Sequence, residues 1–373
     1  MDLYNLILAG GVKKQSNLFA SGEEEDMNED FKRYVDGTLT DVDREMLDGI
    51  TDIRGKAFYG YSSLKSVTIP YTVTNIGDEA FLQCSKLERV SIEAGVTAIG
   101  SSAFAYCFKL AEINIPSSVT SIGNQTFYFC GSLKSISVPS TVTSLGNSVF
   151  SQCVALVDVS LSGGLTSIPQ SSFSGCSALA TVKIPDKVES IGAYAFDSCR
   201  SLTSVNIPSG VRQLNSGSFR YCRSLTNISI PYGVTTIYDY VFDECSSLTS
   251  VTLPDSVTSI GNYAFGYCYS MTNVILSKNI TNIGGYAFIY CQSLSSITIP
   301  SNVTNIGEQA FSSCTSLSSI TLLPPNPPTL GTNAFWNIPN TLKIYVPSAS
   351  VTAYQAASGW SSYASQIEAI PNS

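Results

Sequence analysis

One period of 23 residues runs through most of this 373-residue chain and restricts its fold more than any other feature. A fixed period of this length is typical of a solenoid, in which each repeat forms one coil and contacts only its neighbours. The chain is therefore predicted to be a single repeat protein rather than two or three ordinary domains. The eleven cysteines all keep the period: Cys84, Cys107, Cys130, Cys153, Cys176, Cys199, Cys222, Cys245, Cys268, Cys291 and Cys314.

The first part of each repeat predicts a short strand. Val67 and Ile69 alternate with small polar residues, so one face of the segment is apolar and the other polar. Pro70 ends the strand, because proline cannot donate to a strand ladder. A second, shorter inward pair follows at Val73 and Ile76, which indicates another brief extended segment.

The second part of each repeat predicts a brief helical turn. Asp78 is a typical N-cap residue, and at 100° per residue Ala80, Phe81 and Cys84 fall on one face, toward the core. The cysteine is thus interpreted as a small buried hydrophobe. Gly77 is attributed to close packing between coils, because another coil has proline, which cannot adopt a positive φ, at the equivalent position.

The period divides the chain into four predicted parts. A single coil buries too little apolar surface to fold alone, so both ends of the repeat array need caps. The parts are an acidic leader that is flexible or serves for docking (1–38), an N-terminal cap and half-coil (39–63), about twelve leucine-rich coils (64–323) and a C-terminal cap (324–373).

Charge and hydropathy exclude several classes of partner. Residues 1–55 carry a net charge of −7 and residues 56–373 only −1, so no basic stripe suited to nucleic acid is present. The apolar run at residues 3–12 is too short to span a bilayer, so no membrane insertion is predicted. It also lacks the charge layout of a signal peptide.

The residue types argue against catalysis and against a metal or other cofactor. The chain has no histidine, which excludes Ser-His and Cys-His nucleophile pairs. One thiol per coil does not converge into the four-ligand set that zinc needs. Disulfides are an alternative, since neighbouring coils lie within bridging distance, but the side chains would point in parallel and their number is odd.

Tyrosines form the first candidate binding surface. Tyr240, Tyr263 and Tyr286 occupy equivalent positions in three consecutive coils, and Tyr267 and Tyr290 are predicted to stack beside them. Five largely exposed tyrosines would form an apolar patch of the size that suggests a partner. The alternative is that the rings merely cover neighbouring coils.

Two weaker candidates are an arginine cluster and the outward face of the strands. Arg200, Arg220 and Arg223 form a weak candidate anion site, unless Asp197 and Asp243 neutralise them. The outward strand positions form two rows of small hydroxyl and amide side chains, either a solvated face or a binding surface. Charges gather toward the N-terminal half of these rows, which include Ser66, Arg89, Glu112 and Ser135, and Thr68, Ser91 and Asn114.

Two stretches carry a resemblance to a known family. The repeat SLTSVTLPDSVTSIGNYAFGYC (247–268) resembles the bacterial BspA-like leucine-rich repeat, and KIYVPSASVTAYQAASGW (343–360) is similar to a closing segment of such proteins. The resemblance covers roughly residues 50–370. It implies a right-handed leucine-rich-repeat superhelix with a parallel β-sheet on one side, and the residues add short helical turns on the other.

The same resemblance implies a non-enzymatic binding or adhesion protein displayed outside a bacterial cell. Its partner would be a protein or glycan of a host or neighbouring cell, recognised through the solenoid surface. The alternative is a phage-type tail or fibre component that binds a host cell surface and is attached through residues 1–38, which are also the candidate segment for oligomerisation. An extracellular or cell-surface location is expected, with virion-associated and cytoplasmic locations as alternatives because no signal peptide is seen.

Overall fold

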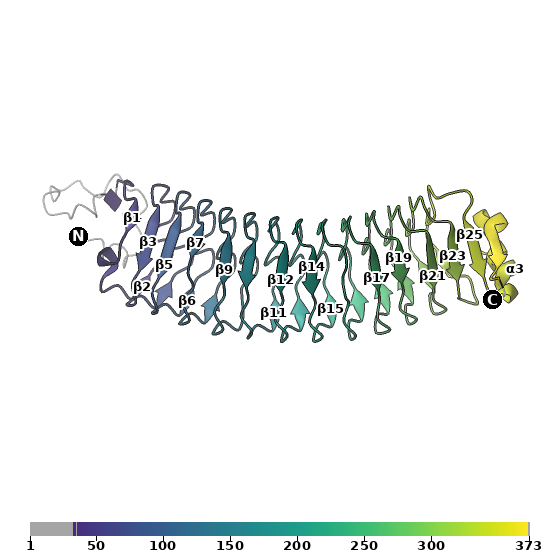
Figure 1. Cartoon of the computed structure of the whole chain (residues 1–373), viewed down its shortest axis with the longest axis horizontal. Helices are drawn as coiled ribbons and strands as arrows, with labels where there is room; N and C mark the ends of the chain where they lie inside the picture. The colour runs from purple at the N-terminus through teal and green to yellow at the C-terminus, as the bar shows by residue number, and fades with distance from the viewer. Residues whose placement is uncertain (1–32, 35, 372–373) are drawn as a thin grey trace. The chain divides into compact units, whose positions relative to one another are not determined.

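The chain folds into stacked coils whose strands pair in parallel, so the predicted repeat solenoid is confirmed. The computed structural model describes all residues except 1–32, 35 and 372–373 (Figure 1). Two compact units, Met1–Lys187 (unit 1) and Val188–Ser373 (unit 2), are described separately. Most of the predicted acidic leader, residues 1–38, lies outside the described residues, and the boundaries predicted at residues 38, 63 and 323 remain predictions.

In unit 1, the coils contribute strands of two to four residues to parallel pairings on one side and two-residue strands to a second parallel ladder. The first ladder runs β1 (Asp41–Val42), β3 (Ser66–Ile69), β5 (Arg89–Ile92) and β7 (Glu112–Ile113), and β9 (Ser135–Ser137) pairs separately with β10 (Asp158–Ser160). The second ladder runs β2 (Asp52–Ile53), β4 (Asn75–Ile76), β6 (Ala98–Ile99) and β8 (Ser121–Ile122). The unit also contains η2 (Glu45–Leu47), β11 (Ser167–Ile168) and β12 (Thr181–Lys183).

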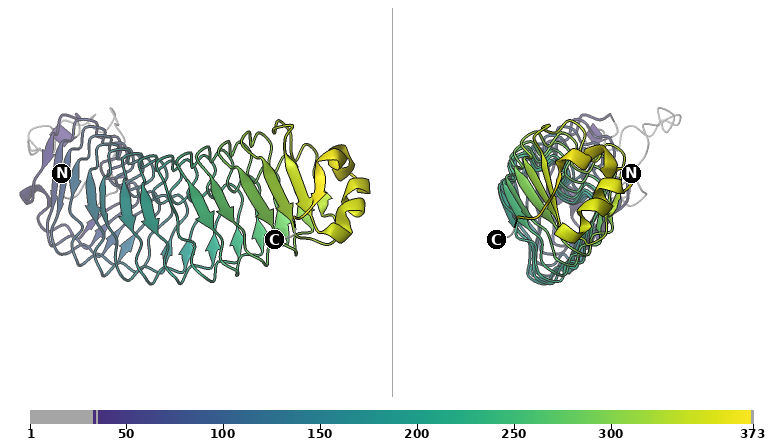
Figure 2. Two further views of the ribbon diagram at one scale, coloured as in Figure 1. Left: turned by 45° about the vertical axis from the view of Figure 1, so that its right-hand side comes forward. Right: turned by 90° about the vertical axis from the view of Figure 1, so that its right-hand side faces the viewer.

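Unit 2 repeats this plan and ends in helices. Its two-residue strands are β13 (Ser190–Ile191), β15 (Gln213–Leu214), β16 (Thr236–Ile237), β18 (Ser259–Ile260), β20 (Asn282–Ile283), β22 (Asn305–Ile306) and β24 (Thr329–Leu330). The longer strands are β14 (Ser204–Asn206), β17 (Ser250–Thr252), β19 (Asn273–Ile275), β21 (Ser296–Ile299), β23 (Ser319–Leu322), β25 (Lys343–Val346) and β26 (Ile367–Ala369). The helices η3 (Ser348–Ser350), α3 (Val351–Ala356) and η4 (Trp360–Gln366) cover its last coil (Figure 2).

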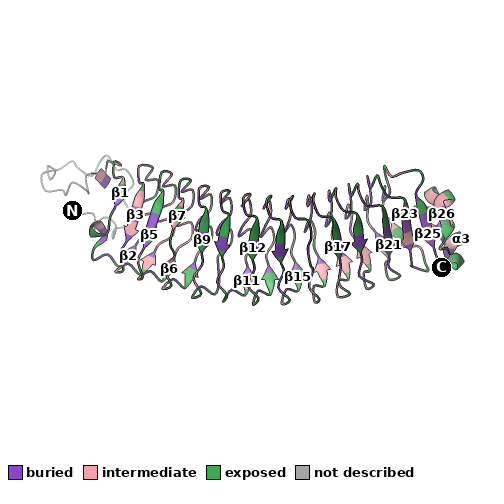
Figure 3. Ribbon diagram, viewed as in Figure 1, coloured by how far each residue is buried: buried purple, intermediate pink, exposed green. Residues whose placement is uncertain are grey.

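The core of each unit contains a ladder of stacked phenylalanine rings. The ring centroids of Phe81 and Phe104 in unit 1 are 5.2 Å apart, and the two ring planes are nearly parallel, with an angle of 3° between them. In unit 2, Phe265 and Phe288 are 5.4 Å apart at 5°. These rings are fully buried, while outward strand residues are exposed or half-buried (Figure 3). The alternation of inward apolar and outward polar strand residues predicted from the repeat is therefore confirmed.

Aromatic residues from outside the regular coils cover the two terminal phenylalanines of these ladders. In unit 1, Tyr34 packs its edge against Phe58, with 5.6 Å between ring centroids. In unit 2, Trp360 lies 6.0 Å from Phe335 and donates its indole N–H to the carbonyl of Pro328 at 2.8 Å. The open ends of a solenoid core need such cover, because no further coil is present to bury them.

The predicted helical turn is wrong in its local conformation: a series of tight turns takes its place. Tyr263, Phe265 and Tyr267 donate their backbone N–H groups to carbonyls of the following coil at 2.7–3.0 Å, whereas the N–H of Gly266 bonds back to the carbonyl of Tyr263 at 3.1 Å. Tyr263 and Tyr267 have φ of 54° and 56°. The left-handed conformation of every fourth residue directs alternate N–H groups toward the next coil. In an α-helix these N–H groups would instead bond to carbonyls four residues earlier in the same helix.

The predicted N-cap residues consequently satisfy a different backbone group. The Oδ1 of Asp78 accepts a hydrogen bond from the backbone N–H of Ser101 at 2.6 Å, and that of Asp239 accepts one from Asn262 at 2.7 Å. Each donor lies one coil further along, so these side chains tie coils together instead of starting a helix. The packing role of Gly77 is confirmed: it lacks a positive φ, and a Cβ there would lie 2.5 Å from the backbone nitrogen of Gly55.

The cysteines are all buried and free, and they do more than fill space. The Sγ of Cys107 in unit 1 donates to the carbonyl of Phe81 at 3.3 Å, and that of Cys268 in unit 2 donates to the carbonyl of Phe242, also at 3.3 Å. Burial raises the pKa of the Cys153 thiol to about 12. The thiol is therefore a neutral hydrogen-bond donor in an otherwise apolar core.

Candidate functional site

The structure brings the five predicted tyrosines together as two stacked rows on the turn side of unit 2. Tyr240 and Tyr263 have ring centroids 5.1 Å apart at 9°, and Tyr263 and Tyr286 are 4.5 Å apart at 2°. Beside this row, Tyr267 and Tyr290 are 5.1 Å apart at 13°. The tight turns produce this arrangement, because they place equivalent residues of successive coils in register.

The sequence predicted five largely exposed rings, but the same stacking leaves all five half-buried. Each ring of the first row covers a face of its neighbour. At one end Arg220 lies over the ring of Tyr240, 5.4 Å from its centroid, and at the other the side-chain amide of Gln309 reaches the hydroxyl of Tyr286 at 3.5 Å. This row therefore presents ring edges and phenol hydroxyls to solvent, with its ring faces covered.

A third ring makes the second row distinctive. Tyr269 packs at right angles to Tyr267, with centroids 6.2 Å apart at 68°, and keeps 36% of its surface exposed. We call Tyr267, Tyr269 and Tyr290 the three-ring cluster of unit 2. The sequence analysis did not single out Tyr269.

Unit 1 contains a second three-ring cluster with nearly the same geometry, formed by Tyr106, Phe108 and Phe129, and here a fourth ring, Tyr128, packs at right angles against Tyr106 and Phe129. Tyr106 stacks on Phe129 at 5.2 Å and 8°, and Phe108 packs against Tyr106 at 5.9 Å and 72° with 46% of its surface exposed. Sequence reasoning missed this cluster. The signal was present, because the three residues stand seven periods of 23 before Tyr267, Tyr269 and Tyr290.

Two of the three predicted anion-site arginines have carboxylate partners within unit 2. Arg220 pairs with Asp243 at 3.1 Å, and Arg223 pairs with Glu244 at 3.1 Å. Arg220 also lies over the ring of Tyr221, 4.5 Å from its centroid. Arg200 is exposed. The predicted neutralisation by Asp243 therefore applies to Arg220, whereas Arg223 pairs with Glu244, which the sequence analysis did not name, and an anion site stays a prediction.

The carboxyl group of Asp243 is an unusual buried charge. The residue is only 4% exposed, its Oδ2 bonds to Arg220, and its Oδ1 has no hydrogen-bond partner in the described part of the chain. Desolvation raises the pKa of Asp243 to about 6, although Arg220 opposes the shift. The folded state therefore binds a proton more readily than the unfolded state between about pH 4 and pH 6.

This proton uptake predicts how stability depends on pH. A carboxyl group whose folded pKa is raised stabilises the fold at low pH and loses that contribution as the pH rises through the folded pKa. As the pH rises from 4 to 7, the free energy of unfolding of Asp243→Asn should therefore increase relative to that of wild type, by about 1–2 kcal/mol in total. Urea unfolding of both proteins across this range measures the difference, and parallel pH profiles would contradict the assignment.

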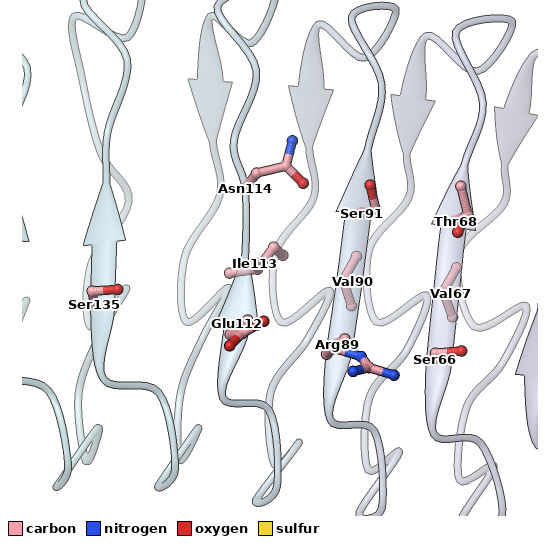
Figure 4. A pocket seen from close by; sticks show the side chains of 10 residues that line it. All are labelled: Ser66, Val67, Thr68, Arg89, Val90, Ser91, Glu112, Ile113, Asn114 and Ser135. Atoms are coloured by element: carbon pink, nitrogen blue, oxygen red, sulfur yellow. The ribbon is translucent and has the colours of Figure 1, made fainter.

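The outward face of the strands in unit 1 is hollowed over about 520 Å³ where β3, β5, β7 and β9 lie side by side (Figure 4). Both predicted outward rows reach this hollow. The first row contributes Ser66, Arg89, Glu112 and Ser135, and the second contributes Thr68, Ser91 and Asn114. The hollow thus falls in the part of the strand face where the sequence gathers its charges.

The described residues contain neither a metal-binding group of side chains nor a membrane-spanning helix. Among them, no group of three or more cysteine and carboxylate side chains is placed to hold a metal ion. In the same part of the chain, no helix combines the length and apolarity needed to cross a membrane. Burial raises the pKa of the Cys84 and Cys314 thiols to about 12, which leaves them as unreactive thiols at neutral pH.

Comparisons with known proteins agree with this architecture. A family model described as the BspA type leucine rich repeat region matches residues 39–157, 147–249 and 235–359. The chain is similar to a leucine-rich repeat protein from Bacteroides ovatus, at 29% identity over 86% of this chain and 88% of that one, with a TM-score of 0.68. It is also similar to a leucine rich cell surface protein from Faecalibacterium prausnitzii, at 31% identity over 87% of both chains, with a TM-score of 0.56. No curated protein matches the chain.

Proposed function

Because the chain belongs to the BspA-type leucine-rich repeat family, we propose that it is a non-enzymatic binding protein that acts outside the cell. Its partner is a protein or glycan of a host or neighbouring cell. The similarity to a leucine rich cell surface protein supports the location. The buried, high-pKa thiols and the lack of histidine support a binding role over a catalytic one.

The observation that carries the proposal is the recurrence of the three-ring cluster, once in each unit. Phe108 and Tyr269 are each more than a third exposed, at the same repeat position, beside a stacked pair of rings. Most coils carry small or polar residues there, including Ser85, Gly131 and Ser246. Covering neighbouring coils therefore does not require aromatic rings at this position, whereas a partner interface is enriched in them.

Two copies of one cluster favour a partner that offers the same group more than once. Each cluster alone would bind weakly, and either cluster can take up a group that the partner repeats. In unit 2 the row of Tyr240, Tyr263 and Tyr286 adds ring edges and hydroxyls beside the cluster. Such edges and hydroxyls suit contacts in which apolar area and hydrogen bonds are combined.

The test is a glycan and matrix-protein array probed with wild type and with variants. Phe108→Ser and Tyr269→Ser together should weaken each binding signal at least about tenfold, and either substitution alone should weaken it less, because one cluster remains. Tyr263→Ser with Tyr286→Ser tests the neighbouring row in the same way. These side chains are partly exposed, so their replacement should leave the fold intact.

Tyr232→Ser is the matched control, because Tyr232 is 77% exposed in unit 2 but belongs to neither row. It should bind like wild type. If the wild type binds and all variants give the same profile, the aromatic surface is not the contact and this proposal is wrong. Robust turnover of a substrate in a panel of hydrolase assays would contradict the non-enzymatic role.

A further inference from the structure

The hollow of unit 1 lies at an interruption of the strand ladder. β5 runs to Ile92, but β7 stops at Ile113, and within the described residues the pairing that joins β3, β5 and β7 does not continue to β9. The side-chain amide of Asn114 takes the place of backbone groups in pairing with β5. Its Oδ1 accepts a hydrogen bond from the N–H of Ile92 at 2.9 Å, and its Nδ2 donates one to the carbonyl of Ile92 at 2.7 Å. The edge of the hollow is therefore fixed before any ligand arrives.

The interruption also uncovers an apolar floor. Ile113 is half-buried, whereas the equivalent Val67, Val90 and Ile136 are at most 4% exposed. Figure 4 shows the side chain of Ile113 beside Glu112 and level with Val90 on the neighbouring strand. Contact between water and the exposed apolar surface of Ile113 is unfavourable, and a bound molecule that covers this surface would remove that cost.

Opposite charges stand in register over this floor without pairing. Arg89 on β5 is aligned with Glu112 on β7, and both are exposed. Neither forms an ion pair or a side-chain hydrogen bond with another described residue. Elsewhere in unit 1, Lys56 pairs with Glu79 and Arg44 with Glu93, each across no more than 3.6 Å. A cation and an anion are thus both available to a ligand within one strand spacing.

We propose that this hollow binds an extended peptide segment of a partner protein that carries one acidic and one basic side chain on the same face. The acidic side chain pairs with Arg89, and the basic one pairs with Glu112 and lays its aliphatic stem on Ile113. Ser66, Ser91 and Ser135 supply hydroxyls to the peptide backbone around this contact. This site is separate from the aromatic clusters and does not depend on the function proposed for them.

The spacing of the two charges selects a peptide over other zwitterions. Neighbouring strands lie about 4.8 Å apart, and alternate side chains of an extended peptide are about 7 Å apart on one face, so flexible side chains can reach both charges. The ammonium and carboxylate of a free amino acid are closer together than the two strands. An acidic glycan would satisfy Arg89 and leave Glu112 opposite a like charge.

The test uses three short, end-blocked peptides in which threonine alternates with charged residues. The charged positions alternate between aspartate and lysine in the mixed peptide, and are all aspartate or all lysine in the other two. Wild type should prefer the mixed peptide by about tenfold in fluorescence anisotropy at low ionic strength, where exposed charges are least screened. Glu112→Arg should change the preference to the all-aspartate peptide, and Arg89→Glu to the all-lysine peptide.

Lys183→Glu is the matched control, since it reverses a charge at an outward strand position of unit 1 that lies outside the hollow. It should keep the wild-type order of preference, as should the Phe108→Ser and Tyr269→Ser double variant. Thermal unfolding checks that each variant is folded. The proposal is overturned if wild type binds no peptide with a Kd below about 1 mM. It is equally overturned if neither reversal changes the order, or if free amino acids or polygalacturonate compete better than the mixed peptide.

Discussion

Replacing Phe265 by alanine is expected to lower the free energy of unfolding of unit 2 by about 3–5 kcal/mol. The ring is fully buried and stacks between Phe242 and Phe288, with 5.4 Å to each centroid. Its removal leaves a cavity between two coils that the rigid backbone ladder cannot close. It also separates the neighbouring rings, and a solenoid depends on each interface between coils. Urea unfolding followed by circular dichroism measures the loss.

Two comparisons separate the stacked ring from apolar volume in general. Phe265→Leu keeps most of the volume and should cost about 1–2 kcal/mol. Tyr267→Ala, in the same coil but on the half-buried turn surface, should cost less than Phe265→Ala. Hydrogen exchange should show the largest loss of protection in the coils on either side of Phe265. An alanine variant within 1 kcal/mol of wild type would mean that the phenylalanine ladder is not the main core.

The regular residues of the repeat predict the core because burial follows directly from the period. Every coil must present the same side chains to the interior, so the leucine, phenylalanine and cysteine positions can be recognised without knowing the backbone conformation. Val73 and Ile76 were predicted as a second inward pair, and Ile76 indeed ends the two-residue strand β4. The cysteine was predicted to be buried, but its hydrogen bond to a phenylalanine carbonyl one coil earlier was not.

The turn conformation could not be predicted because its burial pattern imitates a helix. Ala80, Phe81 and Cys84 are all buried, as one face of a helix would be. The backbone reaches this result differently, with left-handed φ at Glu79 and Gln83. Such angles are unfavourable for these residue types in isolation. They are imposed by hydrogen bonds to the next coil, which a single repeat does not reveal.

The candidate surfaces were predictable only where they follow the period. The stacking of Tyr263 on Tyr286 follows from their equivalent positions. The half-burial of these rings depends on ring orientation, and the hollow lies where β7 ends early, at a residue that fits the strand pattern as well as any other. Ile113 occupies a repeat position that is buried in neighbouring coils, but it is itself only half-buried. Interruptions of a regular repeat are therefore where the sequence is least informative, and the hollow for which we propose a peptide ligand lies at one of them.

Close packing between coils predicts the second large effect. Gly146→Ala is expected to lower the free energy of unfolding of unit 1 by about 3 kcal/mol. A Cβ at Gly146 would lie 2.4 Å from the backbone nitrogen of Asn124 and 2.4 Å from the carbonyl carbon of Gly123. Both atoms belong to the backbone, so no side-chain rotation relieves the overlap. The coils would have to separate, which lengthens the hydrogen bond from the Gly146 N–H to Ile122, now 3.0 Å.

Gly163→Ala in the same unit is the matched control, because a Cβ there would meet nothing within 4 Å. Both substitutions reduce the conformational freedom of the unfolded chain equally, which alone would stabilise the fold by up to about 1 kcal/mol. Gly163→Ala should therefore be neutral or slightly stabilising, and the difference between the variants isolates the clash. Pro169 occupies the position equivalent to Gly146 in the next coil, so some coil interfaces do accept a side chain. If Gly146→Ala costs less than 1 kcal/mol, the spacing between coils is adjustable, and the glycines cannot be what fixes the register of the binding surfaces.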